Sequence, residues 1–275
     1  MCKPDIISRF DLGMERSKIY FASDFHLGLA KEKDGFLRER MIISWLDEIK
    51  ADAKALYLVG DIFDFWFEYK TVVPRGFIRF LGKLAELSDV GIELIFFKGN
   101  HDMWMFDYFQ KELNAKIIDN EFELYDQGKC FFIHHGDGLG SGDRQYKILK
   151  KIFRSRLCQW LFARLHPNLG IGIAQKWSAH SRAANADPEE FQGYEKEWLI
   201  GHSEQMFAEG KKYDFYIYGH RHLPYFIELK NGSKVLNLGE WFHSFTYAVW
   251  DGHTLELKKY IEKGENKSIP PVRSI

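Results

Sequence analysis

The stretch ALYLVGDIFD, residues 55–64, decides the fold of this chain. Its first five residues form an apolar run of the length of a buried strand, and Asp61 follows that run after a single glycine. A carboxylate placed just past the end of a buried strand can bridge two metal ions. We therefore predict that Asp61 bridges a two-metal site and that the other ligands come from the ends of other strands.

Four other clusters of metal-ligand residue types each follow a strand-like run of their own. These clusters are Asp24-Phe25-His26, Gly99-Asn100-His101-Asp102, His135-Gly136-Asp137 and Gly219-His220-Arg221-His222. The runs before them cover residues 18–23, 93–97, 129–134 and 214–218, and apolar residues at helical spacing predict helices over 36–50 and 76–87. This alternation is the pattern of an α/β sheet whose site lies at the carboxyl edge of the strands.

The remaining strand-like runs predict a second sheet and set the domain limits. Residues 121–125 and 129–134 are expected to form a hairpin about Gln127-Gly128. The short runs that would complete the second sheet are 225–229, 234–237, 245–250 and 254–260. We expect a core made of 18–139 and 206–262, a frayed start over 1–17 and a flexible tail over 263–275.

Residues 140–205 are expected to form a basic helical insertion that covers the site. Between residues 144 and 186 the chain has no acidic residue but nine lysines and arginines, and residues 167–170 (PNLG) divide the segment into at least two helices. Apolar residues are interleaved at the spacing of one helix face: Tyr146, Leu149, Phe153, Leu157, Trp160 and Leu161. The segment could bind a lipid-linked phosphate, or it could be a solvated helical cap whose apolar stripe faces the core.

Composition limits the class of protein. With 275 residues the chain can bury a proper core, and a formal net charge of −1 gives no overall attraction to nucleic acid. The three scattered cysteines indicate a reducing cytoplasm and argue against a thiolate zinc site. No run approaches the roughly 18 apolar residues of a membrane-spanning helix. We expect a cytoplasmic protein that at most lies on a membrane surface.

The residue types in the clusters indicate which metals would bind. Imidazole and carboxylate together suit Mn²⁺, Fe or Zn²⁺, whereas oxygen-only sites suit Mg²⁺ or Ca²⁺. Two metal ions that share a carboxylate serve in-line attack on phosphorus. The candidate ligands are Asp24, His26, Asp61, Asn100, His135, His220 and His222. We predict a phosphoester hydrolase with two divalent ions, with Mn²⁺ as the expected metal.

The series D-x-H, G-D-x-x-D, G-N-H-D, H-G-D and G-H-x-H, in this order, resembles the calcineurin-like metallophosphoesterase superfamily. The resemblance covers residues 20–225 and implies a two-sheet βαβ sandwich flanked by helices. It implies that Asp24, His26, Asp61 and His222 hold the first metal ion. Asp61, Asn100, His135 and His220 would hold the second. It also implies that His101 lies beside the scissile phosphate with Asp102 behind it.

A narrower resemblance is to the UDP-2,3-diacylglucosamine pyrophosphatase family of lipid A synthesis. It rests on His135-Gly136-Asp137-Gly138-Leu139, on Ser141-Gly142-Asp143 with Tyr146, and on the basic segment that follows. The resemblance implies a lipid-linked sugar nucleotide as substrate and action at the cytoplasmic face of the inner membrane, through the basic insertion. The substrate contacts that it implies are Asn100, Asp143, Ser181, Asn185 and His220.

One departure from the narrower pattern leaves a second substrate class open. The family has an arginine at the position of His101 and a lysine near Pro188. A histidine can act as a general acid for a poor leaving group, so a soluble nucleotide or another phosphodiester is the alternative substrate. A non-catalytic binding module is the third reading, although none of the seven candidate ligands is missing. A nuclease is disfavoured because the aromatic residues fall at core-facing helical spacing.

The other histidines and two aspartates receive structural readings. His134 precedes His135 inside a strand and is expected in the core or against a ligand. Asp64 and Asp137 are expected to orient ligands rather than to bind metal. The histidines expected to have no role in the site are His166, His180, His202, His243 and His253.

Overall fold

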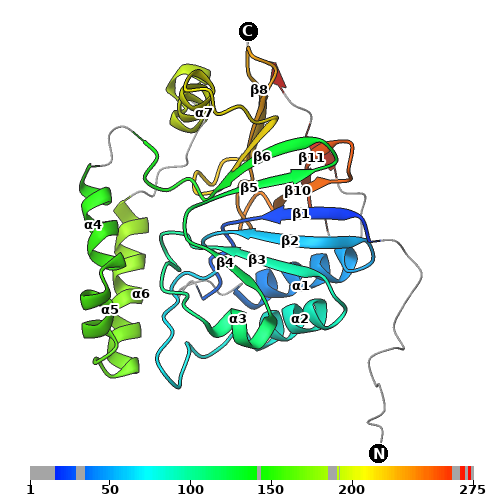
Figure 1. Ribbon diagram of the computed structural model, residues 1–275. Coiled ribbons are helices and arrows are strands. Elements are labelled where there is room, and N and C mark those ends of the chain that lie inside the picture. Colours follow the sequence, from blue (N-terminus) through cyan, green and yellow to red (C-terminus); the bar gives the residue numbers. More distant parts are fainter. Residues whose placement is uncertain are drawn as a thin grey trace, which may run out of the picture.

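The computed structural model describes residues 16–28, 35–140, 144–184, 191, 193–261, 267–269 and 272–273. Within these residues two mixed β-sheets lie face to face, with helices on their outer faces (Figure 1). This arrangement confirms the predicted two-sheet α/β sandwich. The predicted frayed start lies almost entirely outside the described residues.

The first sheet contains the parallel strands predicted from the strand-end clusters. Its order is β12-β11-β10-β1-β2-β3-β4. The parallel strands are β1 (Lys18–Ala22), β2 (Ala53–Val59), β3 (Glu93–Phe97) and β4 (Lys116–Ile118). The helices that connect them are α1 (Gly35–Ile49), α2 (Ile78–Asp89) and α3 (Tyr108–Leu113). The sequence patterns predicted all of these elements except α3 and β4.

The second sheet has the order β13-β8-β9-β7-β6-β5. Its strands are β5 (Glu121–Asp126), β6 (Lys129–His134), β7 (Phe215–Tyr218), β8 (Tyr225–Glu228) and β9 (Lys234–Asn237), with β13 (Val272–Arg273) at its edge. The predicted hairpin is confirmed, since β5 and β6 pair antiparallel across Gln127 and Gly128, both of which have positive φ. Strands β6 and β7 are parallel, so both deliver their clusters to one edge.

The prediction that all four late runs join the second sheet is wrong for two of them. Strand β10 (Thr246–Trp250) pairs antiparallel with β1 of the first sheet, and β11 (Leu255–Lys259) pairs with β10. All five residues of β10 are buried, because the strand lies inside the sheet and packs on both faces. Alternation in the sequence fixes the two faces of a strand but does not say which sheet takes it.

Two short parts of the predicted flexible tail, 267–269 and 272–273, form strands. Strand β12 (Lys267–Ile269) pairs with β11 at the edge of the first sheet, and β13 pairs with β8 of the second. A sheet edge presents unpaired N–H and C=O groups, and these two short segments of the tail satisfy them.

Most apolar burial lies between the sheets and on their outer faces. The inner core combines Phe21, Tyr57 and Trp250 of the first sheet with Phe131 and Ile217 of the second. A second core lies between the first sheet and helices α1, α2 and α3, and a third lies between the second sheet and α7 (Trp198–Ala208). Helix α7 therefore packs with the core, although it begins inside the predicted insertion of 140–205.

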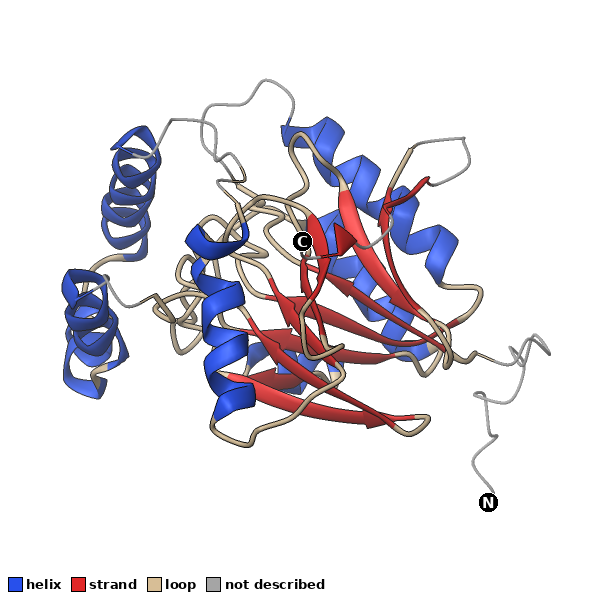
Figure 2. Ribbon diagram, turned by 90° about the horizontal axis from the view of Figure 1, so that it is seen from above, coloured by secondary structure: helices blue, strands red, loops and turns tan. Residues whose placement is uncertain are grey.

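The insertion stands apart from the sheets in both ribbon views (Figures 1 and 2). It contains α4 (Arg144–Arg154), α5 (Arg156–Phe162) and α6 (Pro167–Ala184), followed by a short 3-10 helix, η1 (Tyr194–Lys196). Helix α6 begins at Pro167, which suits the first position of a helix because proline has no N–H to leave unpaired. Phe153 and Phe162 pack on Phe67 and Trp104 of the core and fix the insertion there.

The sequence leaves two readings of the apolar stripe of the insertion open, and the one in which it faces the core does not hold for its later members. Leu157, Trp160 and Leu161 are 64%, 53% and 52% exposed. Helical spacing shows that residues share a face, but it does not show what that face packs against.

Candidate metal centre

The five clusters meet at one edge of the sandwich, where strands β1, β2, β3, β6 and β7 end. The loops are joined by backbone hydrogen bonds. The N–H groups of Asp24 and His26 donate to the carbonyls of Gly60 and Asp61 at 3.1 and 3.0 Å, and Gly219 N–H donates to His135 O at 2.8 Å. Loops that are far apart in the sequence are therefore held in fixed register around the candidate ligands.

Asp24, His26 and His222 form the first group whose ligand atoms lie close enough to hold one metal ion. The Nε2 atoms of His26 and His222 are 3.2 Å apart, and His222 Nε2 lies 3.2 Å from Asp24 Oδ1. Asp24 and His26 are almost fully buried, whereas His222 is half-buried. The group opens to solvent on the side of His222.

Asp61, His135 and His220 form the second such group. Asp61 Oδ2 lies 3.4 Å from His135 Nε2 and 3.8 Å from His26 Nε2 of the first group. The remaining predicted ligand, Asn100, has its Oδ1 3.3 Å from His135 Nε2. Asp61 thus lies between the two groups, which is the position that a bridging carboxylate needs.

The donor atoms present suit divalent cations. His135 Nδ1 lies 2.8 Å from the carbonyl oxygen of Val59, which can only accept, so Nδ1 carries a proton and Nε2 is the nitrogen that faces the site. Among the described residues, the buried Oδ1 of Asp24 and Nδ1 of His26 make no hydrogen bond. Buried polar atoms of this kind normally have partners, and a cation would provide one for the carboxylate.

The electrostatics of the site favour positive charge. Burial opposes charging of His26, but the carboxylates of Asp24 and Asp64, 3.8 and 3.6 Å from its ring nitrogens, raise its pKa to about 10. Burial likewise opposes charging of His135, and the negative charge of Asp61 raises its pKa to about 10. Burial and the charge on His135 lower the pKa of His220 to about 4. A buried carboxylate cluster that holds protons on its histidines can hold metal ions in their place.

The backbone of the site is strained at the candidate ligands. Nine non-glycine residues in the described part of the chain have positive φ, and five of them are candidate ligands: Asp24, His26, Asp61, His220 and His222. Left-handed backbone costs a residue with a side chain free energy, and strain of this kind gathers at functional sites. The loops around the site are therefore shaped for ligand placement rather than for local stability.

Two glycines allow the loops to come this close. A Cβ added at Gly99 would lie 2.1 Å from Oδ1 of Asp61, and one added at Gly60 would lie 2.5 Å from Nδ1 of His135. Gly60 also has a φ of +85°, which residues with a side chain rarely adopt. Any side chain at either position would push a candidate ligand out of place.

Asp102 holds two of these loops together from behind. Its buried carboxylate accepts N–H groups from Gly99 at 2.9 Å, Ile62 at 2.8 Å, and Asp61 and Phe63 at 3.3 Å. Asp102 belongs to none of the candidate metal groups. Asp102 therefore positions Asp61 and the loop that carries Asn100 and His101.

His101 forms a third group with His26 and Asp61, whose ligand atoms also lie close enough to hold one metal ion, and its ring is 4.7 Å from that of His26. Burial lowers its pKa, while the charges of Asp61 and Asp64 oppose that shift. Its Nδ1 lies 3.0 Å from the carbonyl oxygen of Asp64 and 3.0 Å from Oγ of Ser178. Ser178 is on α6 of the insertion, and nothing in the local sequence distinguishes this serine from the others.

Of the two aspartates predicted to orient ligands, Asp64 contacts a candidate ligand and Asp137 does not. Asp64 Oδ1 lies 3.6 Å from His26 Nδ1, close to a candidate ligand. Asp137 instead pairs with Lys150 at 2.5 Å and accepts a hydrogen bond from Tyr146 at 2.5 Å. His134 is buried, and its Nδ1 accepts the N–H of Gly136 at 2.7 Å, as expected of a structural histidine.

Other predicted residues lie outside the candidate metal groups. Of the histidines expected to be structural, the four with described side chains are in none of those groups: His166, His202, His243 and His253. Asp143 and Asn185 lie outside the described residues, as do the side chains of His180 and Ser181. The sequence also gave no hint of Glu197, whose carboxylate binds the Arg221 guanidinium at 3.0 Å and anchors the loop between His220 and His222.

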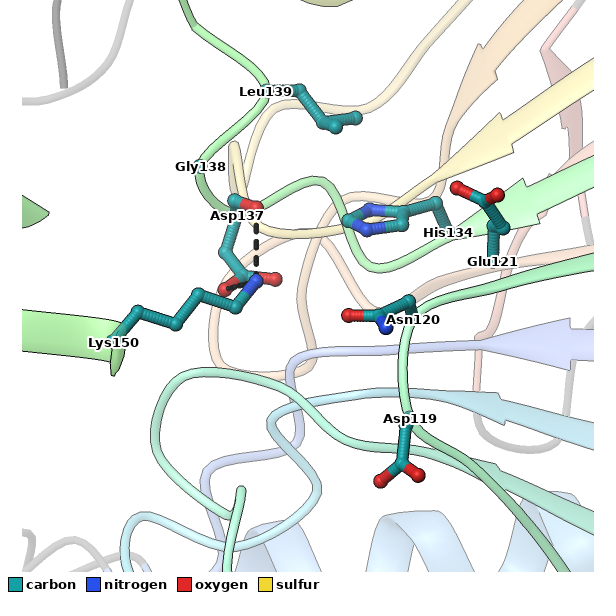
Figure 3. Close-up of a pocket in the computed structure, with 8 residues that line it drawn as sticks. All are labelled: Asp119, Asn120, Glu121, His134, Asp137, Gly138, Leu139 and Lys150. Carbon is teal, nitrogen blue, oxygen red and sulfur yellow. Dashed lines mark hydrogen bonds and ion pairs between the residues drawn. The ribbon is translucent and has the colours of Figure 1, made fainter. Parts of the chain in front are cut away.

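A polar cavity of about 490 Å³ lies beside the site, between the second sheet and α4 (Figure 3). Lys150 reaches across from α4 to Asp137, while His134 lies opposite with Asn120 and Glu121 (Figure 3). Asp137 borders the cavity and is two residues after the candidate ligand His135. The cavity therefore offers hydrogen-bonding groups next to the candidate metal centre.

Comparison with known proteins identifies the family. The model of the calcineurin-like phosphoesterases matches residues 17–224. The chain belongs to this family. As a phosphoesterase of this family it carries its candidate metal groups at the ends of the matched strands.

Several relatives of this phosphoesterase are named UDP-2,3-diacylglucosamine hydrolase. The one from Porphyromonas gingivalis is 44% identical over 255 residues, which cover 88% of this chain and 97% of that protein. One from Edwardsiella ictaluri is 32% identical over 60% of this chain and 62% of that protein. Among solved structures, the phosphoesterase Yfce from E. coli matches with a TM-score of 0.41 at 15% identity, covering 87% of this chain and 91% of Yfce.

Proposed function

We propose that this phosphoesterase hydrolyses the diphosphate of UDP-2,3-diacylglucosamine, releasing UMP and 2,3-diacylglucosamine 1-phosphate. The observation that carries the proposal is the 44% identity to a hydrolase of that name across 97% of its length. The convergence of the candidate metal groups on Asp61 supports the same reaction class. The alternative substrate is a soluble phosphodiester, which the histidine at position 101 favours.

The proposal assigns two divalent ions to the site, with Mn²⁺ expected and Fe or Zn²⁺ compatible with the same ligands. Asp24, His26, Asp61 and His222 would hold one ion. Asp61, Asn100, His135 and His220 would hold the other. When bound, the ions would neutralise charge on the diphosphate and lower the barrier to attack on phosphorus.

The chain's own residues have separate tasks in this mechanism. His101 lies beside the ligands and would hold a proton for the leaving phosphate oxygen at its Nε2, because Nδ1 is engaged with Asp64 O. Asp102 keeps the loop of His101 in register with Asp61. Asn100 and His220 would contact the substrate as well as metal, and we propose Asp143, Ser181 and Asn185 as further substrate contacts.

We propose that the polar cavity beside the site receives the uridine of the substrate. Its volume of about 490 Å³ lies within the range of small-molecule sites. Uracil and ribose need both donors and acceptors, and the lining supplies the Asn120 amide, the His134 imidazole and the Glu121 carboxylate. Replacing Glu121 by alanine should raise KM for the nucleotide substrate and leave hydrolysis of a small chromogenic diester unchanged.

We further propose that the insertion lies on the membrane surface that holds the lipid substrate. Nine of the seventeen large hydrophobic residues that are exposed in the described part of the chain belong to α4, α5, α6 and the links between them. Exposed cations lie among them, including Lys151, Arg156 and Lys176. Apolar residues mixed with cations are suited to the interface of an anionic membrane. Within the described residues, no helix has the length and apolar character to cross a bilayer.

Two of the basic residues of the segment have a different task. Lys150 is paired with Asp137, and Arg154 donates to Asn120 and to the carbonyl of Asp119 at 2.6 and 2.7 Å. These contacts fasten α4 to the core. Membrane binding is therefore best tested on the exposed residues Leu157 and Trp160 rather than on these cations.

The test of substrate class compares purified, Mn²⁺-loaded protein on two substrates. UDP-2,3-diacylglucosamine in mixed micelles should be cleaved to UMP with a far higher kcat/KM than a soluble nucleotide diester. A preference for the soluble diester would reject the lipid substrate.

The membrane proposal has its own test in vesicle binding. A Leu157→Ser, Trp160→Ser variant should lose binding to phosphatidylglycerol vesicles, while Ile78→Ser, which changes a residue 77% exposed on α2, should not. Equal binding by the two variants would reject the membrane contact.

A further inference from the structure

A serine from the insertion reaches the histidine that faces the candidate metal groups. Ser178 on α6 is only 6% exposed, although the insertion otherwise exposes much of its surface. Its Oγ lies 3.0 Å from Nδ1 of His101 and 3.1 Å from Oδ1 of Asp64. The contact joins residues 77 positions apart, from the insertion and from the loop after β3.

The chemistry of the partners fixes the direction of these hydrogen bonds. A carboxylate can only accept, so the hydroxyl proton of Ser178 goes to Asp64 Oδ1. The carbonyl oxygen of Asp64 also can only accept, so Nδ1 of His101 carries a proton, which it shares between that oxygen and the Ser178 oxygen. The result is an ordered chain from the His101 ring through the Ser178 hydroxyl to the Asp64 carboxylate.

This chain leaves only one nitrogen of His101 for the substrate. With Nδ1 held by Asp64 and Ser178, the ring presents Nε2 and cannot turn without breaking two hydrogen bonds. The arrangement therefore orients His101 through a residue that the insertion supplies.

We infer that Ser178 is the positioning residue of His101 and that the insertion thereby completes the catalytic site as well as covering it. The inference rests on the proposed function, in which His101 acts at the leaving oxygen. It assigns Ser178 no contact with metal or substrate. Its effect should therefore appear in the catalytic step and disappear when His101 is absent.

The test is a double-mutant cycle on the Mn²⁺-loaded full chain. Ser178→Ala should lower kcat for a chromogenic phosphodiester by about 3- to 10-fold, the effect of one hydrogen bond, with KM changed less than twofold. In a His101→Ala background the same substitution should change kcat less than twofold, because the group that it positions is gone. Ser178→Thr, which keeps the hydroxyl, should recover most of the rate.

A matched control removes another buried serine hydroxyl. Ser203 is fully buried on α7 and donates to the Leu199 carbonyl at 2.8 Å, away from His101. Ser203→Ala should leave kcat unchanged. Thermal unfolding and bound metal per chain are measured for every variant, so that a loss of folding or of metal is seen directly.

Three outcomes would overturn the inference. The first is equal loss of kcat from Ser178→Ala with and without His101. The second is loss of bound metal in Ser178→Ala, which would mean that Ser178 acts through Asp64 on His26. The third is an unchanged kcat. If wild-type protein instead cleaves no phosphodiester or diphosphate at all, the proposed function fails before the cycle is measured.

Discussion

Removing the carboxylate of Asp102 should destabilise the fold and the metal centre together. The carboxylate is fully buried and accepts four backbone N–H groups, two of them at 2.8 and 2.9 Å and two at 3.3 Å. An unsatisfied buried N–H costs about 1–3 kcal/mol, so the two short bonds alone predict a loss of about 2–6 kcal/mol in Asp102→Ala. That is a large part of the roughly 5–15 kcal/mol by which most domains are stable.

A second variant separates hydrogen bonding from packing. Asp102→Asn keeps the volume of the side chain. Its amide nitrogen can only donate, so two backbone N–H groups would face a donor where they now have an acceptor. Each carboxylate oxygen accepts two of the four N–H groups, and asparagine keeps one oxygen as an acceptor. If the N–H groups are what matter, Asp102→Asn should therefore lose about half as much stability as the alanine variant. If packing of the side chain mattered most, the stability of Asp102→Asn would be close to that of the wild type.

The matched control is Glu68, whose carboxylate accepts the N–H groups of Phe106, Asp107 and Tyr108 at 2.7, 2.8 and 3.1 Å. Glu68→Ala removes a similar set of bonds at the start of α3, where water can replace some of them. Urea unfolding measures the stability of each variant, and calorimetric titration with Mn²⁺ measures metal affinity. Only the Asp102 variants should lose metal affinity. Wild-type affinity in Asp102→Ala would refute the positioning role.

The other predictions concern the centre itself. Asp61→Ala should release both ions and abolish nearly all turnover, as measured by bound metal and by rate; one ion retained at full affinity would show that Asp61 does not bridge. His101→Ala should keep both ions but lose about 10²–10⁴-fold in kcat, most for leaving groups of high pKa; the same loss across a series of leaving groups would disprove a general acid. Mn²⁺ at a hundredfold excess over its Kd should raise the free energy of unfolding by about 2.7 kcal/mol, and a chelator should reverse the gain; no change in thermal unfolding would mean that the folded chain binds no ion.

The sequence predicted the site best where residues of metal-ligand type directly follow a predicted strand. A glycine before Asp61 and Asn100 marks a sharp turn at a strand end, and residue type alone marks a metal ligand. Because parallel strands end at a common edge, placing the strands also placed the clusters beside one another. The parallel strands β1, β2 and β3 and the meeting of the five clusters could therefore be predicted without coordinates.

What could not be predicted depends on contacts between distant segments. The alternating pattern of β10 predicted which residues share each face of the strand, but not that the strand pairs with β1. The tail carried no strand signal strong enough to predict its pairing with β11 and β8. Ser178 looks like any polar residue inside a helix, and only docking of α6 brings it to His101. The exposure of Trp160 likewise depends on which face of α5 the core leaves uncovered.

The positive φ angles of the candidate ligands explain why the loops around the site need a rigid, well-packed core. Five candidate ligands have left-handed backbone, which costs free energy even for aspartate and histidine, although these adopt it more often than most side chains. Residues keep such dihedral angles only where the surrounding structure holds them, so these loops need a closely packed scaffold. Here they join strands whose inner faces form one aromatic core and whose outer faces are covered by helices. Because bound cations would offset part of the same cost, the metal-free chain should be the less stable form, and its loss of stability should begin in the loops after β1, β2 and β7.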